Sequence, residues 1–319
     1  MNKDIALVTG ATSGLGFSAA KQLAADGWAE VIITGRNSGR AGQAATRLAT
    51  ETNKNVFTTV EMDLNTSDSV RAAAEELIGH GRHINFLLLN AGMVSGSDLV
   101  MTDEGVEITY SSSLIGHHQL TMQLLAKGVL APDARIVIAG SEAARGDVPT
   151  FSVVDLAKMA DKTHAGDRAT AAEALIRGDN AVKYKPGNAY ANAKLFVAWW
   201  AQSLARRLPD GMAVYAVSPG SAPDTEAGRN ANFFMKRIMI PVMKLLPGMS
   251  ATVDTAANRY LQAAEFATDV SGEFFASAPK KMTGPIEVMK HDHFHDRANQ
   301  EAAWDAVVRV AGLDYPVSV

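Results

Sequence analysis

The sequence predicts an α/β protein: one Rossmann-like, doubly wound parallel sheet flanked by helices, forming a single domain over residues 1–319. Short apolar runs alternate with longer Ala-rich amphipathic segments, the pattern of stacked βαβ units. The short runs are apolar throughout, as strands covered on both faces should be. No linker, repeat or change in composition divides the chain.

Six strands are expected in order, each preceded or followed by a helical segment. They are IALVTG from residue 5, VIITG from 31, VFTTVEMD from 56, NFLLLNAG from 85, RIVIAGS from 135 and MAVYAVSPG from 212. Residues 145–187 depart from the alternation and are expected to be an insertion. Residues 226–250, with Met235, Met239 and Met243 at helical spacing and Pro241 as a break, are expected to begin a substrate-capping tail over residues 226–319.

Composition limits the possible functions. The chain is 47% hydrophobic and 20% charged, enough for a full core, and its net charge of -4 without a long basic run argues against nucleic acid as a partner. The absence of cysteine excludes disulfides, thiolate metal sites and cysteine nucleophiles. Without a signal-peptide pattern or an apolar run of roughly 20 residues, we expect a cytoplasmic protein with no integral membrane segment and a small-molecule partner.

A glycine-rich turn, TGATSGLG, follows the first strand and opens a helix, with Gly10, Gly14 and Gly16 in the turn. Glycine there lets a pyrophosphate approach the backbone, and the helix N-terminus stabilises its charge. The alternative is tight packing alone. The position after the first strand of a βαβ unit favours a dinucleotide.

The end of the second strand selects the nucleotide. Gly35, Arg36 and Asn37 stand where a carboxylate would hold a ribose 2′-hydroxyl and a base would hold a 2′-phosphate, which favours NADP(H). Arg36 could instead be a solvated charge. Asp63, after the third strand, could meet the adenine or simply form a turn.

Tyr190 and Lys194 lie four residues apart in a predicted helix and therefore on one face. The Lys194 ammonium is expected to lower the pKa of the Tyr190 phenol, so that it exchanges protons near neutral pH. Ser141, at the end of the fifth strand, would supply a hydrogen bond to a substrate oxygen.

Two other clusters have more than one interpretation. His291, His293 and His295 alternate in HDHFHD, a poor spacing for metal, so a solvated loop is preferred and no metal is expected. The methionines of residues 226–250 could form a lid over an apolar substrate, pack in the core, or, with nearby lysine and arginine, touch a membrane surface peripherally.

Taken together, these motifs resemble the short-chain dehydrogenase/reductase family of the Tyr-x-x-x-Lys type, over roughly residues 4–225. The matches are TGATSGLG, GRN at 35–37, Asp63 with Leu64, NAG at 90–92, Ser141, Tyr190 with Lys194, and SPG at 218–220. AYANAKL and SGEFFASAPKKMTGP are similar to the retinol-dehydrogenase and protochlorophyllide-reductase-like branch. The light-driven protochlorophyllide enzymes use a cysteine, which this chain lacks.

The resemblance implies roles for these residues. Tyr190 would be the general acid or base, Lys194 would lower its pKa and hold the nicotinamide ribose, and Ser141 would orient the substrate oxygen. Ser113 stands where the family often has an asparagine of the proton relay. The implied cofactor-binding set is Gly10, Thr12, Ser13, Gly14, Leu15, Gly16, Arg36, Asn37, Asp63, Leu64, Asn90, Ala91, Gly92, Tyr190, Lys194, Pro219, Gly220 and Thr225.

The expected protein is thus an NADP(H)-dependent oxidoreductase acting on a carbonyl or secondary alcohol, of an apolar or aromatic small molecule. Relatives suggest a homodimer or homotetramer. The alternative is a catalytically silent NADP(H)-binding regulator. The 49 positions between Ser141 and Tyr190 exceed the usual family spacing, so the insertion is expected beside the active site.

Overall fold

The computed structural model describes residues 2–93, 98–149, 151–179, 184–222 and 250–315. Within these residues one sheet of eight strands has the order β3-β2-β1-β4-β5-β6-β7-β8. The strands are β1 (Ile5–Val8), β2 (Glu30–Gly35), β3 (Phe57–Glu61), β4 (Ile84–Leu89), β5 (Leu130–Ala139), β6 (Ala213–Val217), β7 (Phe274–Ser277) and β8 (Ile286–Val288). All six predicted strands are present; β7 and β8 were not predicted.

The strands are parallel except β8, which pairs antiparallel with β7. From β1 the chain order runs outward to β2 and β3 on one side and to β4 onward on the other. Ligands of open α/β sheets bind at the carboxyl ends of the strands where the order reverses. That point lies between β1 and β4.

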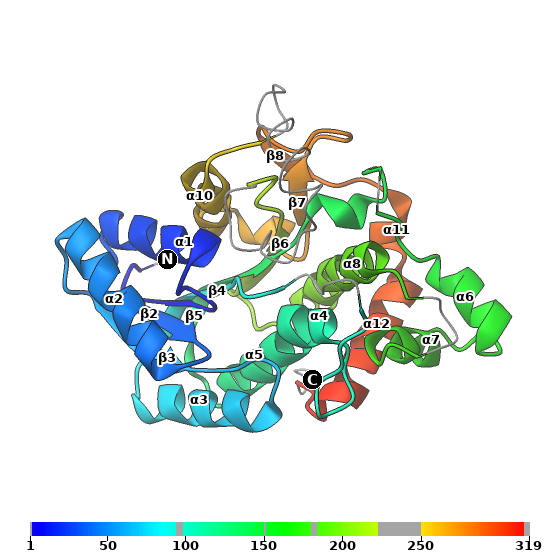
Figure 1. Ribbon diagram of the computed structural model, residues 1–319, viewed down its shortest axis with the longest axis horizontal. Coiled ribbons are helices and arrows are strands. Elements are labelled where there is room, and N and C mark those ends of the chain that lie inside the picture. Colours follow the sequence, from blue (N-terminus) through cyan, green and yellow to red (C-terminus); the bar gives the residue numbers. More distant parts are fainter. Residues whose placement is uncertain (1, 94–97, 150, 180–183, 223–249, 316–319) are drawn as a thin grey trace.

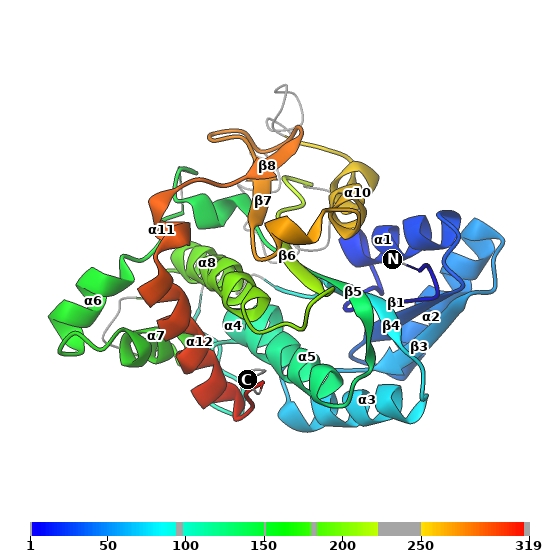
Figure 2. The same cartoon turned by 180° about the vertical axis from the view of Figure 1, so that it is seen from behind.

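Helices cover both faces of the sheet, as Figures 1 and 2 show. Separate buried clusters line the two faces. One face carries α1 (Gly14–Ala25), α2 (Ser38–Thr52) and α10 (Val253–Ala264); the other carries α3 (Ser67–Gly79), α5 (Gly116–Ala126), α8 (Pro186–Ala205) and α12 (Arg297–Ala311). The predicted fold class is confirmed.

The long helix α8 is packed on every side. Pro186 begins it, where a missing backbone N–H costs nothing, and Trp199 and Trp200 are fully buried in its second half. Figure 2 shows α12 lying across α8 and α5. Arg206, just after α8, donates to Gln300 and Glu301 of α12. Any homo-oligomer therefore has to use a surface other than the one that α12 covers.

The insertion folds into α6 (Leu156–Thr163) and α7 (Arg168–Ile176). Arg168 contacts Asp296 and Asn299 at the start of α12, and Figure 1 shows α6 and α7 beyond α8 and α12, at the outer edge of the molecule. The segment before α6 instead runs along α8, where the amide of Val154 donates to Asn192. This first part of the insertion lies beside Tyr190, with the Phe151 ring 6.1 Å from the Tyr190 ring.

Short helices complete the described chain: α4 (Ile108–Tyr110), the π-turn η1 (Ser111–Ile115), the 3₁₀ turns η2 (Glu142–Arg145) and η5 (Thr268–Val270), and α11 (Asp292–His295). In the described part of the chain, no helix combines the length and apolar character that crossing a membrane requires. Thr225 and, apart from Ser250, the predicted segment 226–250 lie outside the described residues.

Candidate active site

The glycine-rich turn between β1 and α1 is built against the end of β4. Gly10 and Gly14 have φ of +64° and +58°, a region that favours glycine. A Cβ on Gly16 would lie 2.5 Å from Nδ2 of Asn90 and 2.6 Å from the Gly10 oxygen. Glycine is therefore required both for the turn and for its close approach to β4.

Two threonines, Thr9 and Thr34, hold this turn in place by hydrogen bonds, and neither was predicted as a site residue. Nδ2 of Asn90 donates to the Thr9 oxygen at 2.9 Å, and the Ala91 amide donates to Oγ1 of Thr9 at 3.0 Å. The Gly10 amide donates to Oγ1 of Thr34 at 3.2 Å. Threonine at the end of each of the first two strands was the available sequence signal.

A cavity of about 680 Å³ lies at the carboxyl ends of β1 to β4, around the point where the strand order reverses. It unites most of the predicted cofactor residues: Gly10, Thr12, Ser13, Gly14, Leu15, Arg36, Asn37, Asp63, Leu64, Asn90, Ala91 and Gly92. Gly35, which the sequence analysis placed beside Arg36, also lines it. Its other lining residues, which were not predicted, are Thr34, Arg40, Met62, Asn65, Met93 and Ser112.

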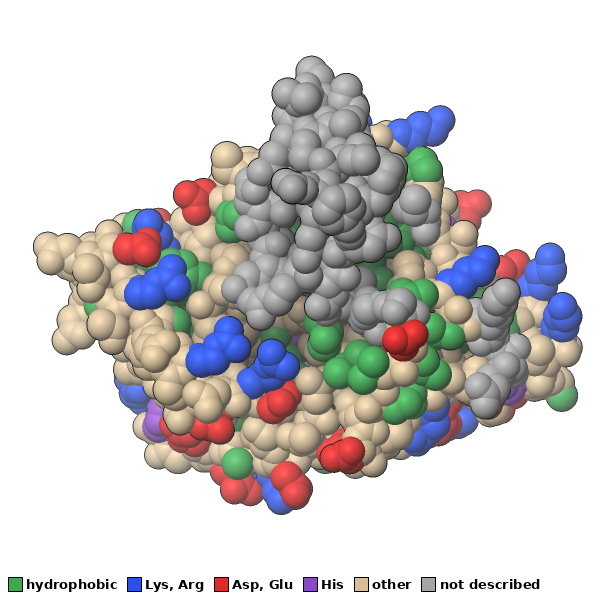
Figure 3. All heavy atoms as spheres, viewed as in Figure 1, with side chains coloured by type: hydrophobic (Ala, Val, Ile, Leu, Met, Phe, Trp, Pro, Cys, Tyr) green, Lys and Arg blue, Asp and Glu red, His purple; other side chains and the backbone are tan. Residues whose placement is uncertain are grey.

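Two arginines stand at the β2 end of this cavity. Arg36 and Arg40 are exposed and both line it. Oδ1 of Asn37 accepts the Arg40 amide at 3.1 Å and so caps α2, which fixes the backbone between the two. The Glu61 carboxylate is engaged by the Ser38 amide at 3.0 Å. Figure 3, which views this face, shows basic and acidic side chains interspersed rather than a broad basic surface.

Asp63 forms a turn and also lines the cavity. Its Oδ1 accepts the Asn65 amide at 3.0 Å, and its own amide donates to Oγ of Ser69 at 2.9 Å. The turn interpretation is thus confirmed, and the Asp63 side chain lies at the cavity wall, while its contact with an adenine stays a prediction.

Ser141, Tyr190 and Lys194 meet beyond the end of β5. Oγ of Ser141 accepts the Ala143 amide at 3.2 Å, capping η2, and it also hydrogen-bonds Tyr190. Nζ of Lys194 donates to the Ala139 oxygen at 2.7 Å and lies 5.9 Å from the centre of the Tyr190 ring. The three predicted catalytic side chains therefore belong to one site.

The expected lowering of the Tyr190 pKa by Lys194 is wrong for this structure. Burial raises the pKa of Tyr190, the hydrogen bond with Ser141 opposes the rise, and the charge of Glu142 adds to it. Burial also lowers the pKa of Lys194, to about 8. The hydrogen bond of the Lys194 ammonium is to a backbone oxygen at the end of β5, and burial is the largest cause of the raised Tyr190 pKa.

Ser113 lies in the π-turn and faces Gly92. A Cβ on Gly92 would lie 3.0 Å from Oγ of Ser113 and 3.5 Å from Nζ of Lys194, so both groups converge on one point. Oγ of Ser113 is buried and has no hydrogen-bond partner among the residues that the structure describes. Its backbone oxygen accepts from Nδ1 of His117, whose other nitrogen then accepts from Oγ1 of Thr9.

The loop after β6 borders the same site. Gly220 has φ of +81°, and a Cβ there would lie 2.7 Å from Nη1 of Arg259 and 2.8 Å from the Met282 oxygen. The Gly220 amide donates to Oγ of Ser218 at 3.2 Å. Pro219 and Gly220 are thus held in a turn whose packing excludes side chains larger than hydrogen at residue 220.

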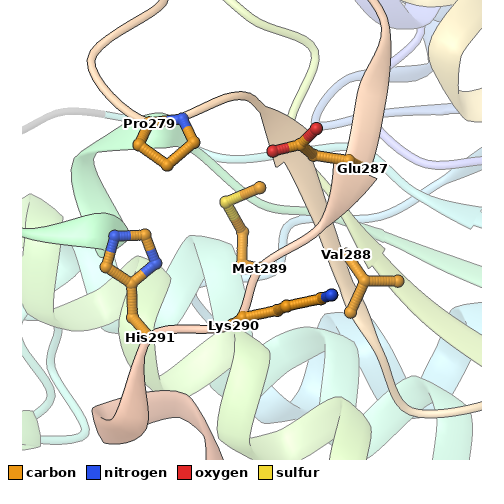
Figure 4. A pocket seen from close by; sticks show the side chains of 6 residues that line it. All are labelled: Pro279, Glu287, Val288, Met289, Lys290 and His291. Atoms are coloured by element: carbon orange, nitrogen blue, oxygen red, sulfur yellow. The ribbon is translucent and has the colours of Figure 1, made fainter.

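A second cavity, of about 610 Å³, lies by the segment that follows β8. Figure 4 shows Met289 and His291 facing Pro279 across it. None of its lining residues belongs to the predicted site. His293 and His295 donate from Nε2 to the backbone oxygens of Ala144 and Met289. Because Asp292–His295 form α11, the prediction of a solvated loop is wrong.

Known proteins resemble this chain. Residues 4–165 match the family model of short chain dehydrogenases. The chloroplastic protochlorophyllide reductase of Chlamydomonas reinhardtii is 24% identical, over 98% of this chain and 78% of the relative. Human retinol dehydrogenase 13 is 27% identical, over 97% of this chain and 85% of the relative. A short-chain dehydrogenase from Burkholderia cenocepacia, solved with NADP, has the same fold, with a TM-score of 0.61 at 22% identity over 86% of this chain and 95% of that chain.

Proposed function

Since the chain belongs to the short-chain dehydrogenase/reductase family, as its motifs predicted, we propose that it transfers hydride between NADP(H) and a carbonyl compound or secondary alcohol. The observation that carries the proposal is the meeting of Ser141, Tyr190 and Lys194 beside the cavity at the strand ends. In this proposal Tyr190 supplies the proton donor and acceptor that an oxidoreductase needs next to its cofactor.

The cavity fits the proposed cofactor. Its floor is the glycine-rich turn, where the N-terminus of α1 and the absence of a Cβ at Gly10 and Gly14 suit a pyrophosphate. Arg36 and Arg40 stand where a ribose 2′-phosphate would lie, and arginine binds phosphate by paired hydrogen bonds. The two arginines favour NADP(H) over NAD(H).

The cofactor, when bound, supplies or accepts the hydride. Tyr190 donates its phenolic proton to the substrate oxygen during reduction and takes it back during oxidation. A raised pKa keeps this proton on the phenol at neutral pH, which suits a general acid. Ser141, already hydrogen-bonded to Tyr190, holds the substrate oxygen beside the phenol. The ammonium group of Lys194 places a positive charge near Tyr190 and Ser141.

The proposed substrate is apolar or aromatic. The Phe151 ring stands beside the Tyr190 ring and supplies apolar surface next to the reacting group. The names of two relatives specify retinol and protochlorophyllide, both large and mainly apolar molecules. A small-molecule partner of this kind agrees with the composition, and a homodimer or homotetramer remains a prediction that gel filtration with light scattering can test.

The deciding experiment is titration of the purified protein with NADPH and NADH, followed by turnover with a panel of aliphatic and aromatic ketones and aldehydes. We expect tighter binding of NADPH and oxidation of NADPH with at least the more apolar carbonyls. Turnover excludes a catalytically silent regulator. Failure to bind either nucleotide would overturn the proposal.

A further inference from the structure

A buried carboxylate directly follows the catalytic serine. Glu142 is 2% exposed. It accepts from the hydroxyl of Ser218, from Oγ of Ser277 at 3.0 Å and from the Ser277 amide at 3.3 Å. One side chain therefore connects the ends of β5, β6 and β7.

Arg259 of α10 reaches the same strand ends from the face of the sheet that α10 covers. It is 6% exposed, and its Nη1 lies 3.3 Å from Oε1 of Glu142. The same nitrogen donates to the Ser218 oxygen at 3.1 Å, while Nη2 donates to the Gly284 oxygen at 2.6 Å and to Oγ of Ser277 at 2.9 Å. The guanidinium thus also fixes the loop between β7 and β8.

The Glu142 carboxylate and the Arg259 guanidinium both hold the turn at Pro219 and Gly220 in place. Oγ of Ser218 donates to Glu142 and accepts the Gly220 amide, so the carboxylate holds the turn through one hydroxyl. Arg259 closes the turn from behind, because Gly220 approaches its Nη1 too closely for any Cβ. The ion pair therefore joins this turn to the residue after Ser141.

We propose that Glu142 and Arg259 are a positioning pair that sets the Pro219–Gly220 turn, and with it the nicotinamide end of the cofactor, relative to Ser141 and Tyr190. The inference rests on the proposed function. Neither residue touches the reacting atoms; each acts through the turn and through Ser141.

Stability alone is a poor explanation for the pair. Two desolvated charges often contribute no more than well-packed apolar groups would, because attraction barely repays desolvation. What an ion pair with several hydrogen bonds supplies is fixed geometry. A misplacement of about 1 Å at a reacting centre can cost about a hundredfold in rate, so such geometry matters here.

The test separates the two ends of the cofactor. In the proposed complex, as the family resemblance implies, the nicotinamide end of NADPH lies at the Pro219–Gly220 turn, whereas 2′,5′-ADP carries only the adenosine and 2′-phosphate end. For Glu142→Gln and for the double variant Glu142→Gln with Arg259→Met, which leaves no unpaired charge, we expect 2′,5′-ADP affinity within about twofold of wild type. We expect NADPH affinity to fall about tenfold and kcat ten- to a hundredfold.

Two further variants keep the test decisive. Ser218→Ala removes the link to Gly220 without creating an unpaired arginine and should show the same selective loss. Glu107→Gln is the matched control, since Glu107 is also a buried carboxylate, 1% exposed, but bonds Thr109 and Tyr110 at the start of α4. It should leave the ratio of the two affinities unchanged even if stability falls.

If the variants bind NADPH and 2′,5′-ADP more weakly by the same factor, the positioning role is overturned. Wild-type affinities for both ligands together with a wild-type kcat would overturn it as well. These results differ from failure of the proposed function, which would appear in the wild-type protein as no binding of NADPH or no turnover. If the charge variants do not fold, the Ser218→Ala result decides.

Discussion

The Lys194 ammonium donates a 2.7 Å hydrogen bond to the backbone oxygen of Ala139, the last residue of β5. Lys194 is only 5% exposed, and burial lowers its pKa to about 8. A buried ammonium costs stability because desolvation disfavours the charged form. The lysine is therefore explained by its position at the site rather than by its contribution to folding.

Replacing Lys194 with methionine should stabilise the protein while reducing turnover. The lowered pKa corresponds to a cost of about 3 kcal/mol at pH 7, which the variant removes. The cost is complete below pH 8 and disappears as the pH rises toward 10.5, the ordinary value. Urea unfolding at pH 7 and pH 10 should show the advantage of the variant shrinking at the higher pH; a variant less stable than wild type at pH 7 would contradict this.

Replacing Tyr190 with phenylalanine should separate chemistry from binding. The variant keeps the ring that faces Phe151 but lacks the proton donor, so kcat should fall by about 10² to 10⁴. NADPH affinity should stay near the wild-type value, as fluorescence titration would show. Tyr215→Phe, a buried tyrosine on β6 whose hydroxyl donates to the Phe266 and Ala267 oxygens, is the control and should retain activity. Full activity of Tyr190→Phe would remove this residue from the mechanism.

The cofactor preference should depend on the two arginines at the end of β2. Arg36→Asp or Arg40→Ala removes a charge-assisted contact with a 2′-phosphate, so NADPH affinity should fall by about tenfold or more while NADH affinity changes little. Arg47→Ala is a matched control, because Arg47 is also on α2 but lies over the Phe17 ring, 4.5 Å from its centre. An unchanged ratio of NADPH to NADH affinity would show that neither arginine holds the phosphate.

The central strands and the catalytic triplet were predictable because their signals are local. A continuous apolar run marks β1, β2, β4, β5 and β6, whereas β3 has Val60 as its one buried residue, and a helix period brings Tyr190 and Lys194 together. β8 has three residues, Ile286–Val288, too few for a periodic pattern. β7 has four residues, as many as β1, but was treated only as part of the tail.

The remainder depends on tertiary contacts. Glu142 and Arg259 are 117 residues apart, and no spacing rule connects them. Arg40 enters the cavity because Asn37 caps α2 and sets the helix start. The direction of the Tyr190 pKa also required the structure, since burial and Glu142 outweigh the hydrogen bond from Ser141. The sequence indicated that Ser141, Tyr190 and Lys194 come together. The desolvation that shifts the pKa of Tyr190 depends on how completely the folded chain buries it.

His118 should make the protein acid-sensitive. Its Nε2 donates to the Leu313 oxygen at 2.8 Å and its Nδ1 accepts from Trp200 at 3.0 Å. Both ring nitrogens of the buried imidazole are therefore hydrogen-bonded in its neutral form. Burial lowers its pKa from 6.5 to about 4. The unfolded chain therefore takes up a proton before the folded protein does, and stability is complete above pH 6.5 and lost as the pH falls toward 4.

Between pH 7 and pH 5 this residue alone should account for a loss of about 2 kcal/mol in the free energy of unfolding. His118→Gln keeps an amide donor and acceptor but cannot titrate, so it should be less stable than wild type at pH 7 and yet lose about 2 kcal/mol less on acidification. Urea unfolding at both pH values measures this, with His83→Gln, on the exposed loop before β4, as the control that should follow wild type. The same pH dependence in wild type and His118→Gln would mean that His118 takes up its proton equally readily in the folded protein, which its two hydrogen bonds and its burial between Trp200 and Trp304 argue against.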